Sequence, residues 1–85
     1  MSYVLVYTSR AQRDIKKLEP KIKNSIEKAM LKLKEEPFLY SSKLTNPKIG
    51  SYRLRVDNYR VIFDIEGWDI VILRVGHRQD IYRNI

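Results

Sequence analysis

The sequence predicts an α+β domain in which a helical hairpin packs on one face of a small antiparallel sheet. Three observations carry this prediction: a short apolar run near the N-terminus, two segments with helical spacing, and alternating strands through the second half. The resulting order is β-α-α-β-β-β, followed by a short C-terminal tail or helix. Because 85 residues suffice for one core only, we expect a single domain over residues 1–85.

In this prediction the first half of the chain holds one strand and two helices. Residues 3–7 are apolar and rich in valine and tyrosine, which favours a strand. Ser9 and Gln12 have the spacing of a capping box, in which both side chains satisfy early helical N–H groups, so a first helix is expected to start there. Pro20 ends that helix and fits the first position of a second one, expected over Pro20–Glu36.

The middle of the chain is expected to hold a loop and then a hairpin. Pro37–Gly50 contains two prolines and no sustained period, which indicates a loop. In Ser51–Asp64 the first strand alternates apolar residues with arginines, the pattern of a half-buried strand. With Asp57-Asn58 as a two-residue turn, the predicted pairs are Val56 with Tyr59, Arg55 with Arg60, and Leu54 with Val61.

This register places three arginines on one face of the hairpin. Arg55 and Arg60 stand directly opposite each other, and Arg53 is next along the same face. Like charges opposed across a ladder destabilise a sheet, so we predict that the three guanidinium groups meet an anion. The alternative for each arginine is a solvated position, in which the stem covers apolar surface while the charged head stays in water.

The last strand, Ile70–Gly76, follows a turn at Gly67, and the length of the connection decides its register. We favour a three-residue connection with Gly67 at positive φ, which moves Arg74 to the basic face. On that register the apolar face receives Val71, Leu73 and Val75. A two- or four-residue connection would instead set Arg74 among the apolar side chains. The tail, long enough for one or two helical turns, brings three further side chains over the end of the basic face: His77, Arg78 and Tyr82.

The composition points to a polyanionic partner, nucleic acid first. The chain has 17 basic and 10 acidic residues, a formal charge of +7, and a pI near 9.8. The absence of cysteine excludes disulfides and thiolate zinc sites, and a lone histidine cannot build a metal site by itself. No apolar run approaches membrane-spanning length and no signal peptide is recognisable, so we expect a cytoplasmic protein without a membrane partner.

Two stretches together resemble a known family. Y-R-L-R-V-D-N-Y-R-V-I-F, followed by V-I-L-R-V-G-H-R-Q-D-I-Y-R, is similar to the RelE branch of the RelE/ParE toxin superfamily, and the likeness covers nearly the whole chain. The resemblance implies a toxin of a type II toxin-antitoxin pair, a ribosome-dependent endoribonuclease that cuts mRNA in the decoding site. It also implies a small acidic, RelB-like antitoxin that masks the basic face, and binding to operator DNA only through the antitoxin complex.

The resemblance also implies which residues form the site. The family's basic strand positions fall on Arg53 and Arg55, its hairpin arginine on Arg60, and its tail arginine and tyrosine on Arg78 and Tyr82. His77 occupies a position that is basic in relatives. Some relatives carry lysine in place of Arg53 and Arg55, and some have a longer interval between the tail arginine and tyrosine.

RNA cleavage of this kind needs no metal or cofactor, because the RNA's own 2′-OH attacks the adjacent phosphate. An enzyme must align the attack, neutralise the developing charge on phosphorus and manage two protons. Arginine suits the second task but is a poor base because it stays protonated. We therefore predict that Arg53, Arg55 and Arg60 bind the phosphate and that Arg78 stabilises charge or the leaving oxygen. Tyr82 is expected to stack on a base or handle a proton, and histidine, whose charge changes near neutral pH, suits acid or base work.

Two other functions remain open. The ParE branch of the same superfamily binds DNA gyrase, and fold alone does not exclude that activity. A non-catalytic RNA-binding module would also explain the charge, because no group in the sequence is an unmistakable base. Strand scission that leaves a cyclic phosphate end separates the enzyme from both alternatives.

Overall fold

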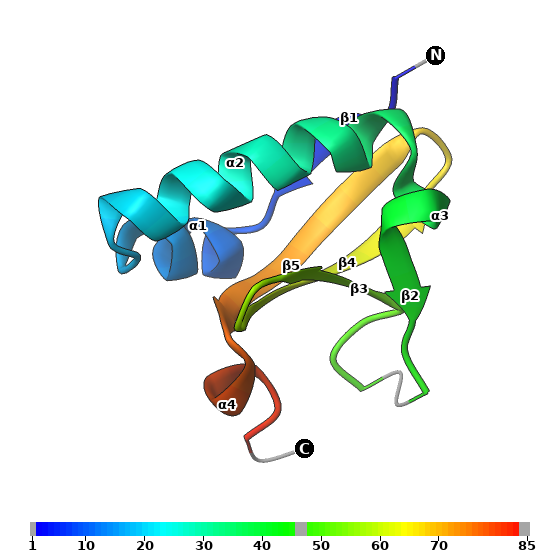
Figure 1. Ribbon diagram of the computed structural model, residues 1–85. Coiled ribbons are helices and arrows are strands. Elements are labelled where there is room, and N and C mark those ends of the chain that lie inside the picture. Colours follow the sequence, from blue (N-terminus) through cyan, green and yellow to red (C-terminus); the bar gives the residue numbers. More distant parts are fainter. Residues whose placement is uncertain (1, 46–47, 84–85) are drawn as a thin grey trace.

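The computed structural model describes residues 2–45 and 48–83 of the chain. Its helices and strands follow one another along the chain as Figure 1 shows. In order they are β1 (Val4–Tyr7), α1 (Ser9–Lys16), α2 (Pro20–Glu35), α3 (Pro37–Tyr40), β2 (Ser41–Lys43), β3 (Tyr52–Val56), β4 (Tyr59–Glu66), β5 (Asp69–His77) and α4 (Arg78–Ile81). Within the described residues, no helix has both the length and the apolar character needed to cross a bilayer.

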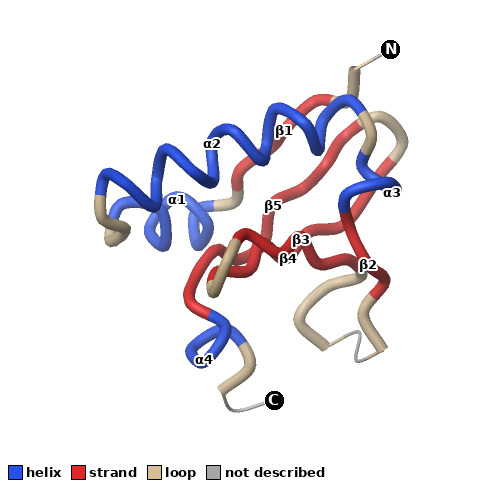
Figure 2. Tube along the Cα trace, in the orientation of Figure 1, coloured by secondary structure: helices blue, strands red, loops and turns tan. Residues whose placement is uncertain are grey.

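The five strands form one sheet in the order β1-β5-β4-β3-β2. The predicted α+β class is confirmed, with α1 and α2 together over one face of the sheet (Figures 1 and 2). The expectation of a purely antiparallel sheet is wrong, because β1 pairs with β5 in parallel, from Val4 opposite Asp69 to Tyr7 opposite Ile72. The helical hairpin between the first strand and the rest allows this, since it carries the chain over the sheet before β2 begins.

The helices begin and end close to the predicted positions, with one change at the first cap. Thr8, rather than Ser9, caps α1: its Oγ1 accepts a hydrogen bond from the Ala11 N–H at 3.2 Å and donates to the Ile72 carbonyl at 2.8 Å. One threonine thus both starts the helix and fastens it to β5. Pro20 is the first residue of α2, as predicted, since its missing N–H has no partner there in any case.

The connection between β4 and β5 differs from the prediction. It has two residues, Gly67 and Trp68, rather than three, although Gly67 has the expected positive φ of 60°. A register shift between Ile62 and Phe63 then inserts an extra residue into β5. Because such a bulge reverses the alternation beyond it, Val75 returns to the core opposite Val61, as the favoured register required, whereas Val71 and Leu73 do not join the core.

The segment predicted as a loop, Pro37–Gly50, contains two short elements. One turn of helix, α3, is followed by β2, which pairs with Tyr52–Leu54 at the edge of the sheet. Residues 46 and 47 lie outside the described part. The loop prediction is therefore wrong for the first half of the segment, where proline starts a helical turn instead of preventing one.

The two faces of the sheet are both covered in part. On the helical side the core contains fully buried side chains from β4, β5 and α2, among them Val61, Phe63, Ile70, Ile72 and Leu33. On the other side Ile62 is also fully buried, and a Cβ placed on Gly50 would lie 2.5 Å from it. Ile81 of α4 packs over Gly76 on this second side. The face expected to be open is therefore partly closed by the chain around Gly50 and by α4.

Candidate functional site

The arginine hairpin has the predicted register. Arg55 stands opposite Arg60, Val56 opposite Tyr59, and Leu54 opposite Val61. Asp57 adopts a positive φ of 54° in the turn, which aspartate tolerates better than most residues. The backbone therefore holds Arg53, Arg55 and Arg60 at the positions that the alternation indicated.

The tail reaches Arg53. Its Nη1 donates a hydrogen bond to the hydroxyl of Tyr82 at 3.2 Å, joining β3 to the C-terminal end of α4. Within the described residues, Nε of Arg53 is buried and has no hydrogen-bond partner. A buried donor without a partner is costly, so this guanidinium offers an unused N–H next to a phenol.

Arg60 is placed differently from Arg53. Its Nη1 donates to the carbonyl oxygens of Asp57 and Tyr59, both at 2.8 Å, and only 9% of the residue is exposed. The guanidinium therefore folds back on the hairpin turn instead of extending beside Arg55. This corrects the expectation of three exposed guanidinium groups, because two carbonyls of the tight turn attract the nearest cation.

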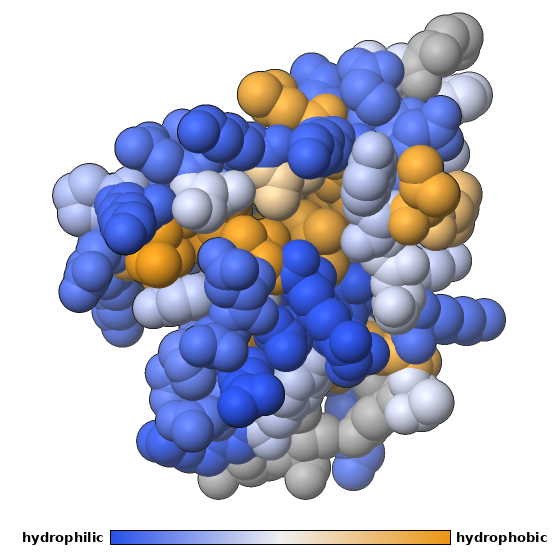
Figure 3. Space-filling model, viewed as in Figure 1, coloured by the Kyte–Doolittle hydropathy of each residue, from blue (hydrophilic) through white to orange (hydrophobic). Residues whose placement is uncertain are grey.

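Arg55 lies in a groove on the helical side of the hairpin. The groove, of about 290 Å³, is lined by four residues besides Arg55 and Leu54 of β3 and Tyr40 of α3: Ser25, Lys28, Ala29 and Lys32 of α2. In the space-filling view, apolar side chains lie in the hollow beneath α2 and hydrophilic ones flank it (Figure 3). Arg55 therefore faces the lysines of α2, and no contact joins it to Tyr82 among the described residues.

His77 and Arg78 lie where β5 ends and α4 begins. Nδ1 of His77 accepts the Gln79 N–H at 3.2 Å and caps α4, which leaves Nε2 as the remaining ring nitrogen. The His77 ring meets the Tyr59 ring edge-on at 5.4 Å. The N–H of Arg78 donates to the Asn58 carbonyl at 2.8 Å, fixing α4 on the hairpin turn, while the Arg78 side chain is exposed.

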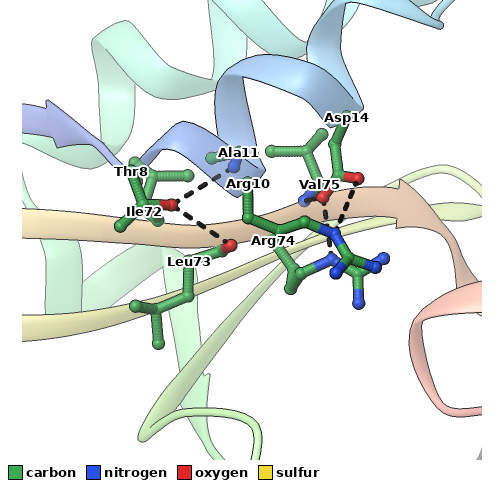
Figure 4. A network of polar contacts seen from close by, with 8 residues as sticks. All are labelled: Thr8, Arg10, Ala11, Asp14, Ile72, Leu73, Arg74 and Val75. Atoms are coloured by element: carbon green, nitrogen blue, oxygen red, sulfur yellow. Dashed lines mark hydrogen bonds and ion pairs between the residues drawn. The ribbon is translucent and has the colours of Figure 1, made fainter.

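Arg74 is held by α1 through Asp14. Oδ2 of Asp14 accepts from Nε of Arg74 at 2.8 Å and from the N–H of Val75 at 3.0 Å (Figure 4). Arg10 lies 3.7 Å from the other carboxylate oxygen. Arg74 has therefore left the apolar core, as predicted, but an acidic partner neutralises it.

A pocket that sequence reasoning missed lies between α1 and the end of β5. We call it the α1–β5 pocket. It has a volume of about 430 Å³ and is lined by Arg10, Arg13, Asp14, Lys17, Leu18, Tyr59, Arg74, Val75, Gly76, His77 and Asp80. The available signal was the spacing of Arg10, Arg13 and Lys17, which places three cations along one side of a helix.

The described residues contain no group of three or more histidine, aspartate or glutamate side chains that could hold a metal ion. What the hairpin and tail offer instead is cationic donors beside a phenol and an imidazole. Such an arrangement binds and polarises a phosphate through charge-assisted hydrogen bonds.

Comparison with known proteins adds the family context. Residues 5–82 match the family described as the ParE toxin of the type II toxin-antitoxin system, parDE. Toxin RelG from Mycobacterium tuberculosis is 38% identical over 86 residues, which cover 98% of this chain and 99% of RelG. The match includes both the arginine hairpin and most of the tail.

Solved structures resemble the chain along most of its length. The toxin-antitoxin complex RelBE2 from M. tuberculosis has a TM-score of 0.82 at 31% identity, covering 92% of this chain and 100% of that chain. The RelB-RelE complex from Methanococcus jannaschii has a TM-score of 0.72 at 25% identity, covering 91% and 94%. The intact E. coli RelBE complex, at 22% identity and TM-score 0.75, covers 89% and 96% and is similar in fold.

Proposed function

The chain belongs to the RelE/ParE superfamily of type II toxin-antitoxin toxins, and from this premise we propose that it is a ribosome-dependent, metal-independent endoribonuclease. It would cut mRNA in the decoding site and so stop translation. The observation that carries the proposal is the hydrogen bond between Arg53 and Tyr82, which sets an incompletely bonded guanidinium against a phenol at the end of the arginine hairpin.

The reaction joins the 2′ oxygen of the RNA to the adjacent phosphorus and breaks the bond from phosphorus to the 5′ oxygen. A 2′,3′-cyclic phosphate and a free 5′-OH result. One proton leaves the 2′-OH and one reaches the departing oxygen. Fixed cations that meet the extra negative charge as it develops on phosphorus are worth about a hundredfold to a thousandfold in rate for each donor.

We assign the charge-stabilising role first to Arg53 and Arg78. Arg53 has a free Nε, and the Arg78 side chain is exposed on α4 beside the hairpin turn. Arg60 acts by holding the turn and placing its charge behind the phosphate. Arg55 contacts the RNA from the groove that faces α2.

The two protons fall to the groups that can exchange them. Tyr82 either exchanges a proton through its hydroxyl or stacks on a base. His77 uses Nε2, because its Nδ1 is engaged by the backbone of α4.

Cellular partners follow from the same proposal. Similar structures from M. tuberculosis, M. jannaschii and E. coli were solved as toxin-antitoxin complexes. We expect a small acidic, RelB-like antitoxin for this chain, because a chain of net charge +7 attracts an acidic partner. The pair would bind operator DNA through the antitoxin, and the free toxin would act on ribosomes and mRNA in the cytoplasm.

The test is cleavage of a defined message in a translating extract, with the new ends analysed. The parent protein should leave 2′,3′-cyclic phosphate ends only when ribosomes translate. Arg78→Ala and Tyr82→Phe should each slow cleavage at least about a hundredfold. Arg83→Ala serves as the matched control, because Arg83 is an exposed arginine in the same tail, paired with Asp80 at 3.5 Å. Equal cleavage by all four proteins would refute the assigned roles.

Gyrase inhibition is the second candidate, favoured by the description of the matching family as the ParE toxin. The hairpin and tail arginines serve a phosphate more directly than a protein surface, which is why we rank cleavage first. DNA supercoiling by gyrase and mRNA cleavage should be measured side by side. Inhibited supercoiling with intact message would reverse the ranking.

A further inference from the structure

The rim of the α1–β5 pocket carries more positive than negative charge. Four cationic side chains line it against two carboxylates. Asp14 is largely occupied, because its Oδ2 already accepts from Arg74 and from the backbone of β5. Arg13 and Lys17 form no ion pair among the described residues. Two cations on one side of α1 are therefore available to an anion.

The opposite wall of the pocket is aromatic. Tyr59 and His77 pair across β4 and β5, and their rings meet at 78° with centroids 5.4 Å apart. Val75 and Gly76 of β5 contribute backbone and apolar surface between these rings and α1. A free phosphate needs only the cations. A wall of rings beside cations fits a ligand that carries a flat base as well as a phosphate.

The helix α4 connects this pocket to the candidate active site. His77 and Asp80, at its start and middle, line the pocket, and Tyr82, at its end, accepts the hydrogen bond from Arg53. A polymer held between Arg53 and Tyr82 has only to cross one turn of helix to reach the pocket. The exposed Arg78 side chain lies on that same turn.

We propose that the α1–β5 pocket binds one nucleotide of an RNA chain that flanks the cleaved linkage, with the phosphate against Arg13 and Lys17 and the base beside Tyr59 and His77. The proposal rests on the proposed ribonuclease function. An acidic protein segment would satisfy the cations but would leave the aromatic wall without a matching group, so RNA is the better fit. The RNA is either the message or ribosomal RNA, which present the same chemistry.

The first experiment measures binding of a fluorescent single-stranded RNA across a range of salt concentrations. Arg13→Ala/Lys17→Ala should weaken binding about tenfold near 0.1 M salt, and should reduce the slope of log affinity against log salt by about 1.4, or 0.7 for each lost phosphate contact. The matched control is Lys16→Ala/Lys21→Ala, which removes the same charge from exposed residues outside the pocket. Equal weakening by both pairs would overturn the proposal, since it would reflect net charge alone.

A second variant tests the aromatic wall. Tyr59→Leu keeps an apolar side chain against the core but removes the ring, so it should weaken RNA binding several-fold without changing the salt slope. Tyr59→Phe keeps the ring and should bind as the parent does. Circular dichroism confirms folding of each variant. Loss of affinity in Tyr59→Phe equal to that in Tyr59→Leu would count against base recognition.

Two arms identify the source of the RNA. Weaker binding of Arg13→Ala/Lys17→Ala to the free oligonucleotide indicates the message, and weaker binding only to ribosomes without message indicates ribosomal RNA; both support the pocket. Unchanged binding in both arms, with or without a loss of affinity for an acidic antitoxin, overturns it. If the parent cleaves message while this variant binds RNA normally, the pocket fails and the ribonuclease stands. If the parent never cleaves but the variant binds RNA more weakly, the reverse holds.

Discussion

Arg53 and Tyr82 are 29 residues apart in the chain, and a hydrogen bond of 3.2 Å joins their side chains. This bond closes α4 onto β3 and is the only side-chain hydrogen bond that α4 and its C-cap make to β3 among the described residues. A double-mutant cycle of Arg53→Ala and Tyr82→Phe should give a coupling of about 1 kcal/mol in the free energy of unfolding. Urea unfolding measures it. Additive effects of the two substitutions would show that the bond contributes nothing in solution.

Arg60 is expected to matter for stability as well as for cleavage. Arg60→Ala removes two hydrogen bonds from the carbonyls of the hairpin turn and should lower the free energy of unfolding by about 2 kcal/mol. Arg55→Ala is the matched control, since Arg55 is exposed and should change stability by less than about 0.5 kcal/mol. Thermal and urea unfolding compare the two. A parent-like stability for Arg60→Ala would mean that its turn contacts are weak.

Asp14 should be the acidic residue whose loss costs the fold most among those tested here. Asp14→Ala leaves Arg74 and the Val75 N–H without their acceptor and should lower the free energy of unfolding by about 2 to 3 kcal/mol. Asp80→Ala removes only an exposed pair with Arg83 at 3.5 Å, worth less than about 0.5 kcal/mol. Urea unfolding of both variants decides. Similar losses would show that the network in Figure 4 is no stronger than a surface ion pair.

Two glycines separate steric crowding from backbone strain. A Cβ on Gly50 would lie 2.5 Å from Cγ2 of Ile62 and 2.9 Å from Cδ1 of Leu73, whereas a Cβ on Gly67 meets no atom within 4 Å. Both residues have positive φ. Gly67→Ala should therefore cost about 1 kcal/mol from strain alone, and Gly50→Ala about 2 to 4 kcal/mol because crowding adds to strain. Equal melting temperatures for the two variants would contradict this difference.

The sequence predicted what depends on local pattern. Alternation in Tyr52–Val56 and the Asp57-Asn58 turn fixed the hairpin register, because a slip of one residue would have turned the apolar side chains outward. Helical spacing and Pro20 located the second helix to within one residue. The approach of the tail tyrosine to Arg53 was also predicted, and the short interval after Arg78 does not prevent it.

What the sequence did not predict depends on tertiary contacts. No glycine or proline marks the bulge between Ile62 and Phe63, so the length of the β4–β5 connection alone was misleading. Alternation gives the side of the sheet on which Arg60 begins, but not that its guanidinium turns back to two carbonyls. The α1–β5 pocket required the packing of α1 against β5, which no local pattern contains.

The parallel pairing of β1 with β5 has a consequence for biosynthesis. Val4 has no strand partner until Asp69 has been made, so the sheet cannot be completed on a nascent chain that lacks its last third. Contacts so distant in the chain form late and slowly. A toxin built in this way acquires its cutting surface only near the end of its own translation, which spares the message that encodes it for almost the entire time that it is being read.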